Sequence, residues 1–299
     1  MVKRGRSILV KIVTDSTSDL PLDYASRLSI GIIPFKVSFG ERTFIDGADL
    51  NHQQFIEYLK KHKCLPSTTM ATPVDYQLAF SRFLEECDED IIYLSISSAL
   101  SGSYQSALTA QKLINDPRLI VEDGQSISMG LGLKAIGAAR LAQEGCSKEE
   151  ILRKVKGWRH VHAYIAVNDL SYLHRGGRVK ANERVLAGIL NIKPIISMKE
   201  KGELFLWDKV RGFRRSMRMI VDKVESFGLD LRKRTVAIGY SAEEELALEM
   251  KALLSERMDL GEVIIFSPGS AVCSHLGPGA VAVFFLAASP PGSRNPARM

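Results

Sequence analysis

Three short segments rich in hydroxyl side chains are the residues best suited to hold a small anion. They are residues 14–18, 67–69 and 97–103, and each lies where an apolar or turn-forming stretch leads into a helical pattern. In open α/β sheets, ligands bind at the carboxyl ends of strands, close to helix N-termini. Hydroxyl and free backbone N–H groups can hold an anion there without a lysine. The alternative is that each segment only caps a helix, as Ser and Thr often do; three such segments favour a shared polar pocket.

A second candidate is His275, which lies in the sequence His-Leu-Gly-Pro-Gly between two apolar stretches. Gly277 and Gly279 would allow the backbone to approach a ligand closely. The alternative is a turn histidine without a role.

Basic residues gather at two places in the second half of the chain, around a Gly-Gly turn at 176–177 and around one helical pattern. Such clusters fit an acidic partner or a phosphate group, and the alternative is a solvated helix face. The residues are Arg175, Arg178, Lys180, Lys209, Arg211, Arg214, Arg215, Arg218 and Lys223.

Signatures of common catalytic and nucleotide sites are missing. The chain has no G-x-S-x-G elbow, no H-E-x-x-H pair and no phosphate-binding loop of the G-x-x-x-x-G-K-[ST] type. Residues 277–282 match G-x-G-x-x-A, but they lead into a strand pattern and not into a helix, which argues against a dinucleotide site. A stand-alone small-molecule kinase or hydrolase using Asp15, Ser98 and His275 stays open as the alternative function.

Composition is that of a soluble globular protein, with 299 residues, 45% hydrophobic and 25% charged. The net charge of +6 comes largely from the ends: without the five basic residues at 3–6 and 294–298, 35 basic residues face 34 acidic ones. This weakens a nucleic-acid-binding hypothesis based on residues 209–218. No apolar run approaches the about 20 residues of a membrane span, and the four cysteines form no C-x-x-C pair, so we expect a cytoplasmic protein without a metal site.

The elements needed to position these residues alternate between strand and helix, which predicts an α/β fold with a mostly parallel sheet flanked by helices. Residues 91–96 are apolar except for Ser95 and show no polar alternation, as in a parallel strand covered on both faces. A composition shift near residue 160 predicts two α/β domains, residues 1–160 and 161–288, followed by a disordered tail at 289–299. Within the first domain, 30–39 is a predicted strand, 66–73 a loop and 125–144 a helix.

The motifs, taken in order, resemble those of the DegV family of bacterial lipid-binding proteins over residues 8–286, nearly the whole chain. Each motif is weak alone, but seven in register are specific. They are residues 12–21 (IVTDSTSDLP), Ile33-Pro34 with Asp46-Gly47, 66–69 (PSTT), 97–107 (SSALSGSYQSA), 173–179 (LHRGGRV), 209–212 (KVRG) and 275–279 (HLGPG).

The resemblance implies two α/β domains with one long-chain fatty acid bound between them and no cofactor. It also implies a non-catalytic subunit, which presents the fatty-acid carboxylate to a separate ATP-binding kinase subunit that makes an acyl phosphate for phospholipid synthesis. By similarity, Thr68 and Ser98 would bind the carboxylate, together with Ser97, Thr69 and His275. Arg178 and Arg211 match the family's partner-docking basic residues.

One departure from the family pattern lies at residues 70–73, where Met-Ala-Thr-Pro stands in place of the usual Gln-Pro-Ser continuation and could alter the pocket edge. We further hypothesise that hydroxyl groups, in place of an arginine, hold the carboxylate. A permanent ion pair would stabilise the charged ground state and oppose transfer to phosphate.

Overall fold

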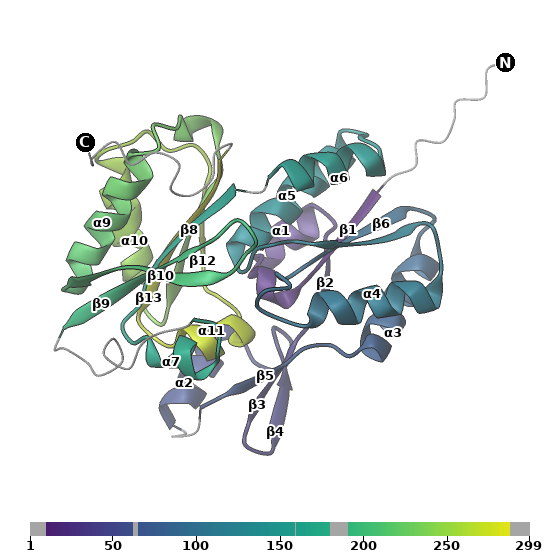
Figure 1. The fold of residues 1–299 in the computed structure, drawn as a ribbon, viewed down its shortest axis with the longest axis horizontal. Coiled ribbons are helices and arrows are strands. Elements are labelled where there is room, and N and C mark those ends of the chain that lie inside the picture. The colour runs from purple at the N-terminus through teal and green to yellow at the C-terminus, as the bar shows by residue number, and fades with distance from the viewer. Residues whose placement is uncertain (1–9, 62–64, 159, 180–190, 288–299) are drawn as a thin grey trace.

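The computed structural model describes residues 10–61, 65–158, 160–179 and 191–287. These residues form two lobes side by side, the first ending at residue 158 and the second running from 160 to 287 (Figure 1). The predicted tail at 289–299, the basic start, Cys64 and Lys180 lie outside the described residues.

The first lobe is built on a four-stranded sheet in which each neighbouring pair is parallel, as the sequence predicts. Its central strands are buried along almost their whole length, because helices cover both faces. In spatial order the strands are β2 (Gly31–Ile33), β1 (Val10–Asp15), β6 (Asp90–Ser95) and β7 (Leu119–Asp123). The helices of this lobe are η1 (Ser16–Ser18), α1 (Leu22–Arg27), α2 (His52–Lys61), α3 (Pro73–Glu86), α4 (Ser103–Ile114), α5 (Met129–Gln143) and α6 (Lys148–Gly157).

A small antiparallel sheet extends from the first lobe and differs from the prediction. Residues 30–39 do not form one strand, because Pro34 has no N–H to continue the parallel ladder and the chain leaves the sheet there. The following strand β3 (Lys36–Phe39) pairs with β4 (Arg42–Ile45) and with β5 (Ser67–Thr69). The segment expected to be a loop at 66–73 therefore contains a strand, in which Thr68 lies opposite Val37.

The second lobe contains a six-stranded mixed sheet. Only the pair β11–β12 is parallel, and the other neighbouring pairs are antiparallel. In spatial order the strands are β10 (Leu204–Arg211), β9 (Ile192–Met198), β8 (His160–Ala166), β13 (Ala280–Ala287), β11 (Val236–Ser241) and β12 (Val263–Phe266). Its helices are α7 (Ser171–Arg175), α9 (Phe213–Glu225), η2 (Leu231–Lys233), α10 (Glu244–Ser255) and α11 (Ser270–Leu276).

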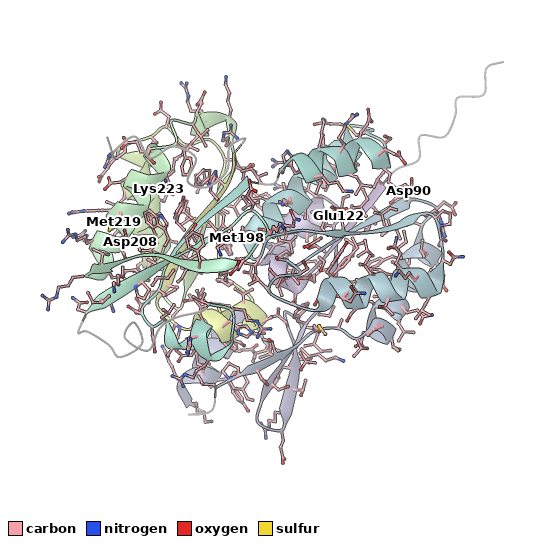
Figure 2. The ribbon with its side chains drawn as sticks, viewed as in Figure 1. Asp90, Glu122, Met198, Asp208, Met219 and Lys223 are labelled. Atoms are coloured by element: carbon pink, nitrogen blue, oxygen red, sulfur yellow. The ribbon has the colours of Figure 1, made fainter. Side chains whose placement is uncertain are left out.

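The two faces of this second sheet bury different partners. On β13, Val283 and Phe285 belong to a core cluster shared with α9 and α10, whereas Ala282 and Phe284 belong to one shared with the first lobe. Helix α5 packs on this inner face, and a Cβ at Gly130 would lie 2.8 Å from Val161 Cγ1, so the helix approaches the sheet closely. Side chains fill the space between the ribbons of the two lobes, and Met198 lies at this junction (Figure 2). The lobes therefore share one hydrophobic core.

Helix α11 belongs to the second lobe but is anchored by two buried carboxylates of the first. Asp19 accepts a hydrogen bond from the Gly269 backbone N–H at 2.8 Å. Asp46 accepts from both the backbone N–H and the hydroxyl of Ser270, at 2.7 and 2.6 Å. Residues 270–276 form a helix because these acceptors satisfy the first donors of its N-terminus, and His275, which we expected in a Gly/Pro-rich loop, lies in its last turn.

Replacing Asp46 tests this anchor. Asp46→Ala leaves the two donors of Ser270 without an acceptor in a buried setting, so we expect the free energy of unfolding to fall by about 1–3 kcal/mol. Urea unfolding measures it, with an unchanged slope and a lower midpoint. Asp208→Ala is the matched control: Asp208 is exposed and accepts only from its neighbour Lys209, so its loss should change stability by less than about 0.5 kcal/mol. Equal midpoints for the two variants would contradict the anchor.

Candidate functional site: a cavity between the lobes

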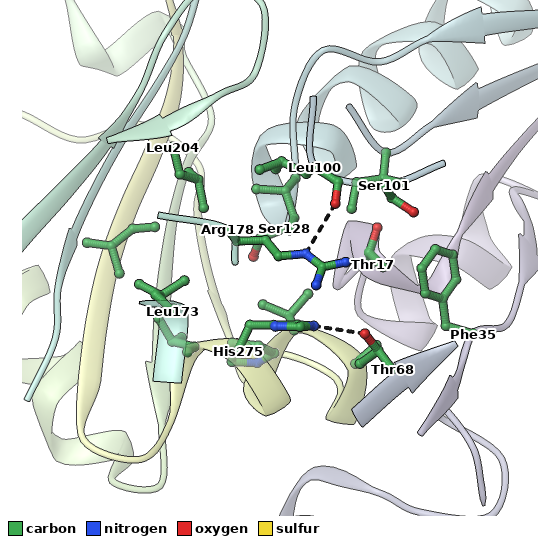
Figure 3. A pocket seen from close by; sticks show the side chains of 18 of the residues that line it. Thr17, Phe35, Thr68, Leu100, Ser101, Ser128, Leu173, Arg178, Leu204 and His275 are labelled. Carbon is green, nitrogen blue, oxygen red and sulfur yellow. Dashed lines mark hydrogen bonds between the residues drawn. The ribbon is translucent and has the colours of Figure 1, made fainter. Parts of the chain in front are cut away.

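A cavity of about 440 Å³ lies between the two lobes (Figure 3). This is within the range of roughly 300–1,000 Å³ typical of small-molecule sites. The first lobe contributes the ends of its strands and the loops that follow them, and the second lobe contributes the inner face of its sheet together with α11.

Most of the cavity wall is apolar, and the inner face of the second sheet supplies a large part of it. Ile165 on β8, Leu204 on β10 and Phe284 on β13 point into it, since they occupy the inward positions of their strands. Phe266 at the end of β12 and Leu276 on α11 extend the same surface. An apolar chain in this part of the cavity would meet no polar side chain that requires a partner.

One end of the cavity is polar. Thr68, fixed by the pairing of β5 with β3, places its Oγ1 atom 2.8 Å from Nε2 of His275 on α11. Burial and, as the smaller cause, the nearby Arg178 guanidinium together lower the pKa of His275 to about 4. The imidazole is therefore neutral at pH 7. Its Nδ1 atom is buried without a hydrogen-bond partner among the described residues. The ring packs closely against Gly176, where only a glycine fits, because a Cβ there would lie 2.2 Å from Nδ1.

Arg178 reaches from the second lobe across the polar end (Figure 3). Its Nε donates to the carbonyl of Leu100 in the first lobe at 3.2 Å, and its Nη1 donates to the carbonyl of Gly176 at 2.6 Å. The guanidinium is half-buried, and burial lowers its pKa. A cation thus lines the same cavity as the hydroxyl groups, whereas our hypothesis placed no arginine at the carboxylate.

The structure brings some of the predicted site residues together and separates others. Thr68, Thr69 and His275 line the cavity, whereas Ser97 and Ser98 do not. Ser98 is exposed, and its hydroxyl donates to Asp123 at 2.6 Å, since the loop turns that side chain toward the end of β7.

Ser97 ties the lobes together instead: its hydroxyl donates to the carbonyl of Lys201 in the turn between β9 and β10, at 2.9 Å. The hydroxyl of this loop that lines the cavity is Ser101, and Thr17 and Ser128 join it from other loops of the first lobe. Sequence patterns locate the loops at 14–18 and 97–103 but not which hydroxyl faces inward, because that depends on the backbone turn at each position.

Arg211 lies apart from the cavity. It is exposed at the end of β10, just before α9, whose exposed basic residues continue the same surface. Arg178 and Arg211 therefore differ in setting, the first in the cavity wall and the second on the outer surface.

The residues of the alternative kinase or hydrolase function do not form one constellation. Asp15 is buried and accepts hydrogen bonds from Thr17, Tyr93 and the Ile96 backbone. Ser98 is bonded to Asp123 and His275 to Thr68, as described above. A hydrolase of this kind needs its nucleophile, base and orienting acid in hydrogen-bond contact, and each of the three has another partner here.

The part of the chain that the structure describes contains no group of three or more His, Cys, Asp or Glu side chains arranged to hold a metal ion. None of its helices has both the length and the apolar character required to cross a bilayer.

Sequence comparison finds relatives along nearly the whole chain. The family model described as "Uncharacterised protein, DegV family" matches residues 9–288. A DegV domain-containing protein of Caldanaerobacter subterraneus is 35% identical over 277 residues, which cover 92% of this chain and 98% of that protein. Another, from Deinococcus radiodurans, is 32% identical over 279 residues, covering 92% and 97%.

Solved structures show the same architecture. One described as showing fatty acid binding of a DegV family protein from Thermus thermophilus has a TM-score of 0.86 at 27% identity and covers 93% of this chain and 99% of its own. The structure of DegV from Bacillus subtilis, described as a fatty acid binding protein, has a TM-score of 0.83 at 26% identity, with the same two coverages.

The setting of His275 predicts its titration. Nuclear magnetic resonance of the imidazole should give a midpoint near pH 4, with His275→Gln assigning the signal. Because the folded-state pKa lies below the unfolded value of about 6.5, the unfolded chain binds more protons between these values. Stability should therefore fall as the pH drops from about 6.5 toward 4, and it should fall less steeply in His275→Gln. A midpoint near 6.5 would show that the ring is solvated.

Proposed function

The chain belongs to the DegV family, and from this and the form of the cavity we propose that it binds a long-chain fatty acid between its lobes. The observation that carries the proposal is the division of the cavity into a long apolar wall and one polar end. A fatty acid has the same division. That two similar structures are described as fatty acid binding proteins supports the proposal.

The apolar wall is sufficient to supply the affinity. Burying about 14 methylene groups at about 0.8 kcal/mol each gives an upper limit near 11 kcal/mol. Association and imperfect polar pairing remove several kcal/mol of this. The polar end therefore has to orient the carboxylate and replace its water, and it does not have to provide most of the binding free energy.

The carboxylate is proposed to lie at the polar end, between Thr68 and Arg178. His275 is neutral and its Nδ1 has no partner, so we assign the ring proton to Nε2, where it donates to Thr68 Oγ1. The hydroxyl hydrogen of Thr68 is then free to donate to the ligand. Arg178 donates to backbone carbonyls and has N–H groups left for a carboxylate oxygen. Ser101 completes this set in place of Ser98.

We further propose that the chain presents the bound carboxylate to a separate ATP-dependent kinase subunit. The sequence has no nucleotide-binding motif, and Asp15, Ser98 and His275 have separate partners. An acidic face of the partner would dock on the basic outer surface that contains Arg211. The isolated chain should then turn over no ATP in the presence of fatty acid, and turnover would favour the stand-alone kinase.

Variants at the polar end test the ligand and its position. The experiment is mass spectrometry of the purified protein, intact and after organic extraction, followed by titration with oleate. Thr68→Val and Ser101→Ala each remove a hydrogen bond to a charged group, worth about 1.5–3 kcal/mol, so the dissociation constant should rise about 10- to 100-fold.

Ser98→Ala serves as the control from the same loop, because its hydroxyl is committed to Asp123, and it should bind oleate like the wild type. If Ser98→Ala weakens binding and Ser101→Ala does not, the carboxylate position is wrong. If the wild type yields no fatty acid and takes up none, the ligand class is wrong.

Charge reversal at Arg211 tests the docking surface. Arg211→Glu should lower acyl-phosphate formation with the kinase subunit about tenfold, equivalent to about 1.4 kcal/mol, and leave the lipid content unchanged. Arg153→Glu is the control, since Arg153 is an exposed arginine on α6 in the other lobe. Equal coupled activity of the two variants would refute docking at Arg211. Arg178 is unsuitable for this test because it lines the cavity.

A further inference from the structure

Asp15 is a fully buried carboxylate that lies one side chain away from the cavity. It ends β1, and its Oδ1 accepts hydrogen bonds from the backbone N–H of Thr17, at 3.0 Å, and from the Thr17 hydroxyl. Its Oδ2 accepts from the backbone N–H of Ile96 at 2.9 Å and from the hydroxyl of Tyr93 at 3.1 Å. Thr17 itself lines the cavity, so this hydroxyl forms a short route between Asp15 and the ligand space.

A second, longer route of hydroxyl groups also runs from Asp15 to the cavity. The Tyr93 hydroxyl lies 2.9 Å from that of Tyr76. The Ser103 side chain lies close enough to the Tyr76 hydroxyl to lower its pKa, although burial raises that pKa more strongly. The Ser103 hydroxyl lies 2.9 Å from that of Ser101, which lines the cavity. Tyr93, Tyr76 and Ser103 are completely buried, and so water does not interrupt this long route.

The charge on Asp15 fixes the direction of every hydrogen bond in both routes. A hydroxyl has one hydrogen to donate, and Tyr93 and Thr17 donate theirs to Asp15. Tyr93 can then only accept from Tyr76. At the far end of the long route, the Ser101 hydroxyl lies 3.9 Å from Sδ of Met70 and 2.9 Å from the Ser103 hydroxyl. A thioether sulfur is the weaker acceptor, so we expect Ser101 to donate to Ser103. The two hydroxyl oxygens that reach the cavity therefore present lone pairs to it and no hydrogen.

This arrangement conflicts with an anionic ligand, because lone pairs repel a carboxylate. We propose that Asp15 takes up one proton when a fatty-acid carboxylate enters the cavity. The inference rests on the proposed function above. With Asp15 neutral, its own hydrogen is donated to the first hydroxyl of a route, and each hydroxyl turns toward the ligand. Thr17 or Ser101 then donates to the carboxylate.

The proton balance is simple. A fatty acid in water near pH 7 is a carboxylate, and the proton comes from the solvent. It is bound at Asp15 and the ligand stays ionised, so one proton disappears from the solution for each ligand bound. No covalent bond other than this O–H bond forms, and the hydroxyl groups change only their orientation.

The charges around both ends of the routes favour this uptake. Asp19 lies close enough to Asp15 and Asp46 for both to raise its pKa, although its own burial is the larger cause. Burial raises the pKa of Asp15, and the hydrogen bonds from Thr17, Ile96 and Tyr93 oppose this rise. An incoming anion adds a further negative charge to these buried carboxylates.

The groups facing the ligand end are Arg178 and the neutral His275. The negative charges of Asp15 and Asp75 both oppose ionisation of the Tyr76 hydroxyl and so raise its pKa. Among the described residues, Arg178 is therefore the one cation that lines the cavity. Its single positive charge does not balance the negative charges of the buried carboxylates and of the ligand together.

Calorimetry tests the proposal directly. Delipidated protein is titrated with oleate at pH 7 in phosphate and in Tris, whose ionisation enthalpies differ, and the difference in binding enthalpy gives the number of protons exchanged. We expect uptake of about one proton in the wild type and about none in Asp15→Asn. Carbon-13 NMR of carboxyl-labelled oleate should show the ionised ligand in the wild type.

Two further variants keep the test decisive even if Asp15→Asn does not fold. Thr17→Val with Tyr76→Phe keeps Asp15 but interrupts both routes, and we expect it to lose at least half of the proton uptake. Tyr164→Phe removes the hydroxyl of a tyrosine equally buried but packed against Trp207 outside the cavity, and it should take up protons like the wild type.

Three results would overturn the proposal: oleate binding without proton uptake, unchanged uptake in Asp15→Asn or in the double variant, or a protonated ligand. The first of these leaves the proposed function intact because oleate still binds. A wild type that binds no oleate overturns the proposed function and, with it, this inference.

Discussion

The hydrogen bonds that Asp19 and Asp46 accept from the start of α11 are the interaction on which the site depends. They cross from one lobe to the other and fix the helix that carries His275. His275 in turn meets Thr68, which a strand of the first lobe holds in place. The polar end of the cavity is therefore assembled from two lobes through buried carboxylates. Such groups are costly to bury, and removing their partners is strongly destabilising, so the arrangement has few alternatives.

The apolar part of the cavity follows from a different constraint, the alternation of side chains along a strand. The central strand β13 contributes Val283 and Phe285 to the core under α9 and α10, and Ala282 and Phe284 to the face toward the first lobe. The apolar strand β13 thus contributes both to the core of the second lobe and to the wall of the cavity. The first lobe covers the inner face of the second sheet incompletely. The part of that face that stays uncovered becomes a wall of the cavity.

Much of the fold could be predicted from local patterns, since the segment 91–96, most of which forms β6, is almost entirely apolar and the first lobe repeats strand and helix in turn. The confirmed parallel sheet came from this periodicity. What could not be predicted depends on contacts between distant residues: the strand at Ser67–Thr69 exists because β3 has an open edge, and α11 exists because Asp46 lies against it. For the same reason, the sequence could not predict that Ser101 faces the cavity and Ser98 does not. The turn before α4 and the acceptor on Asp123 decide which hydroxyl faces inward.

The shared core has a consequence for the lifetime of the protein. The inward residues Ile165, Leu204 and Phe284 belong at once to the cavity wall and to the hydrophobic cluster that joins the lobes. A bound acyl chain would complete that cluster, and a ligand that binds only the folded state stabilises it in proportion to the logarithm of its concentration. Lipid-loaded molecules would then unfold less often and resist proteolysis longer than empty ones. The amount of this protein in a cell would in that way follow the supply of its own ligand, without any change in its synthesis.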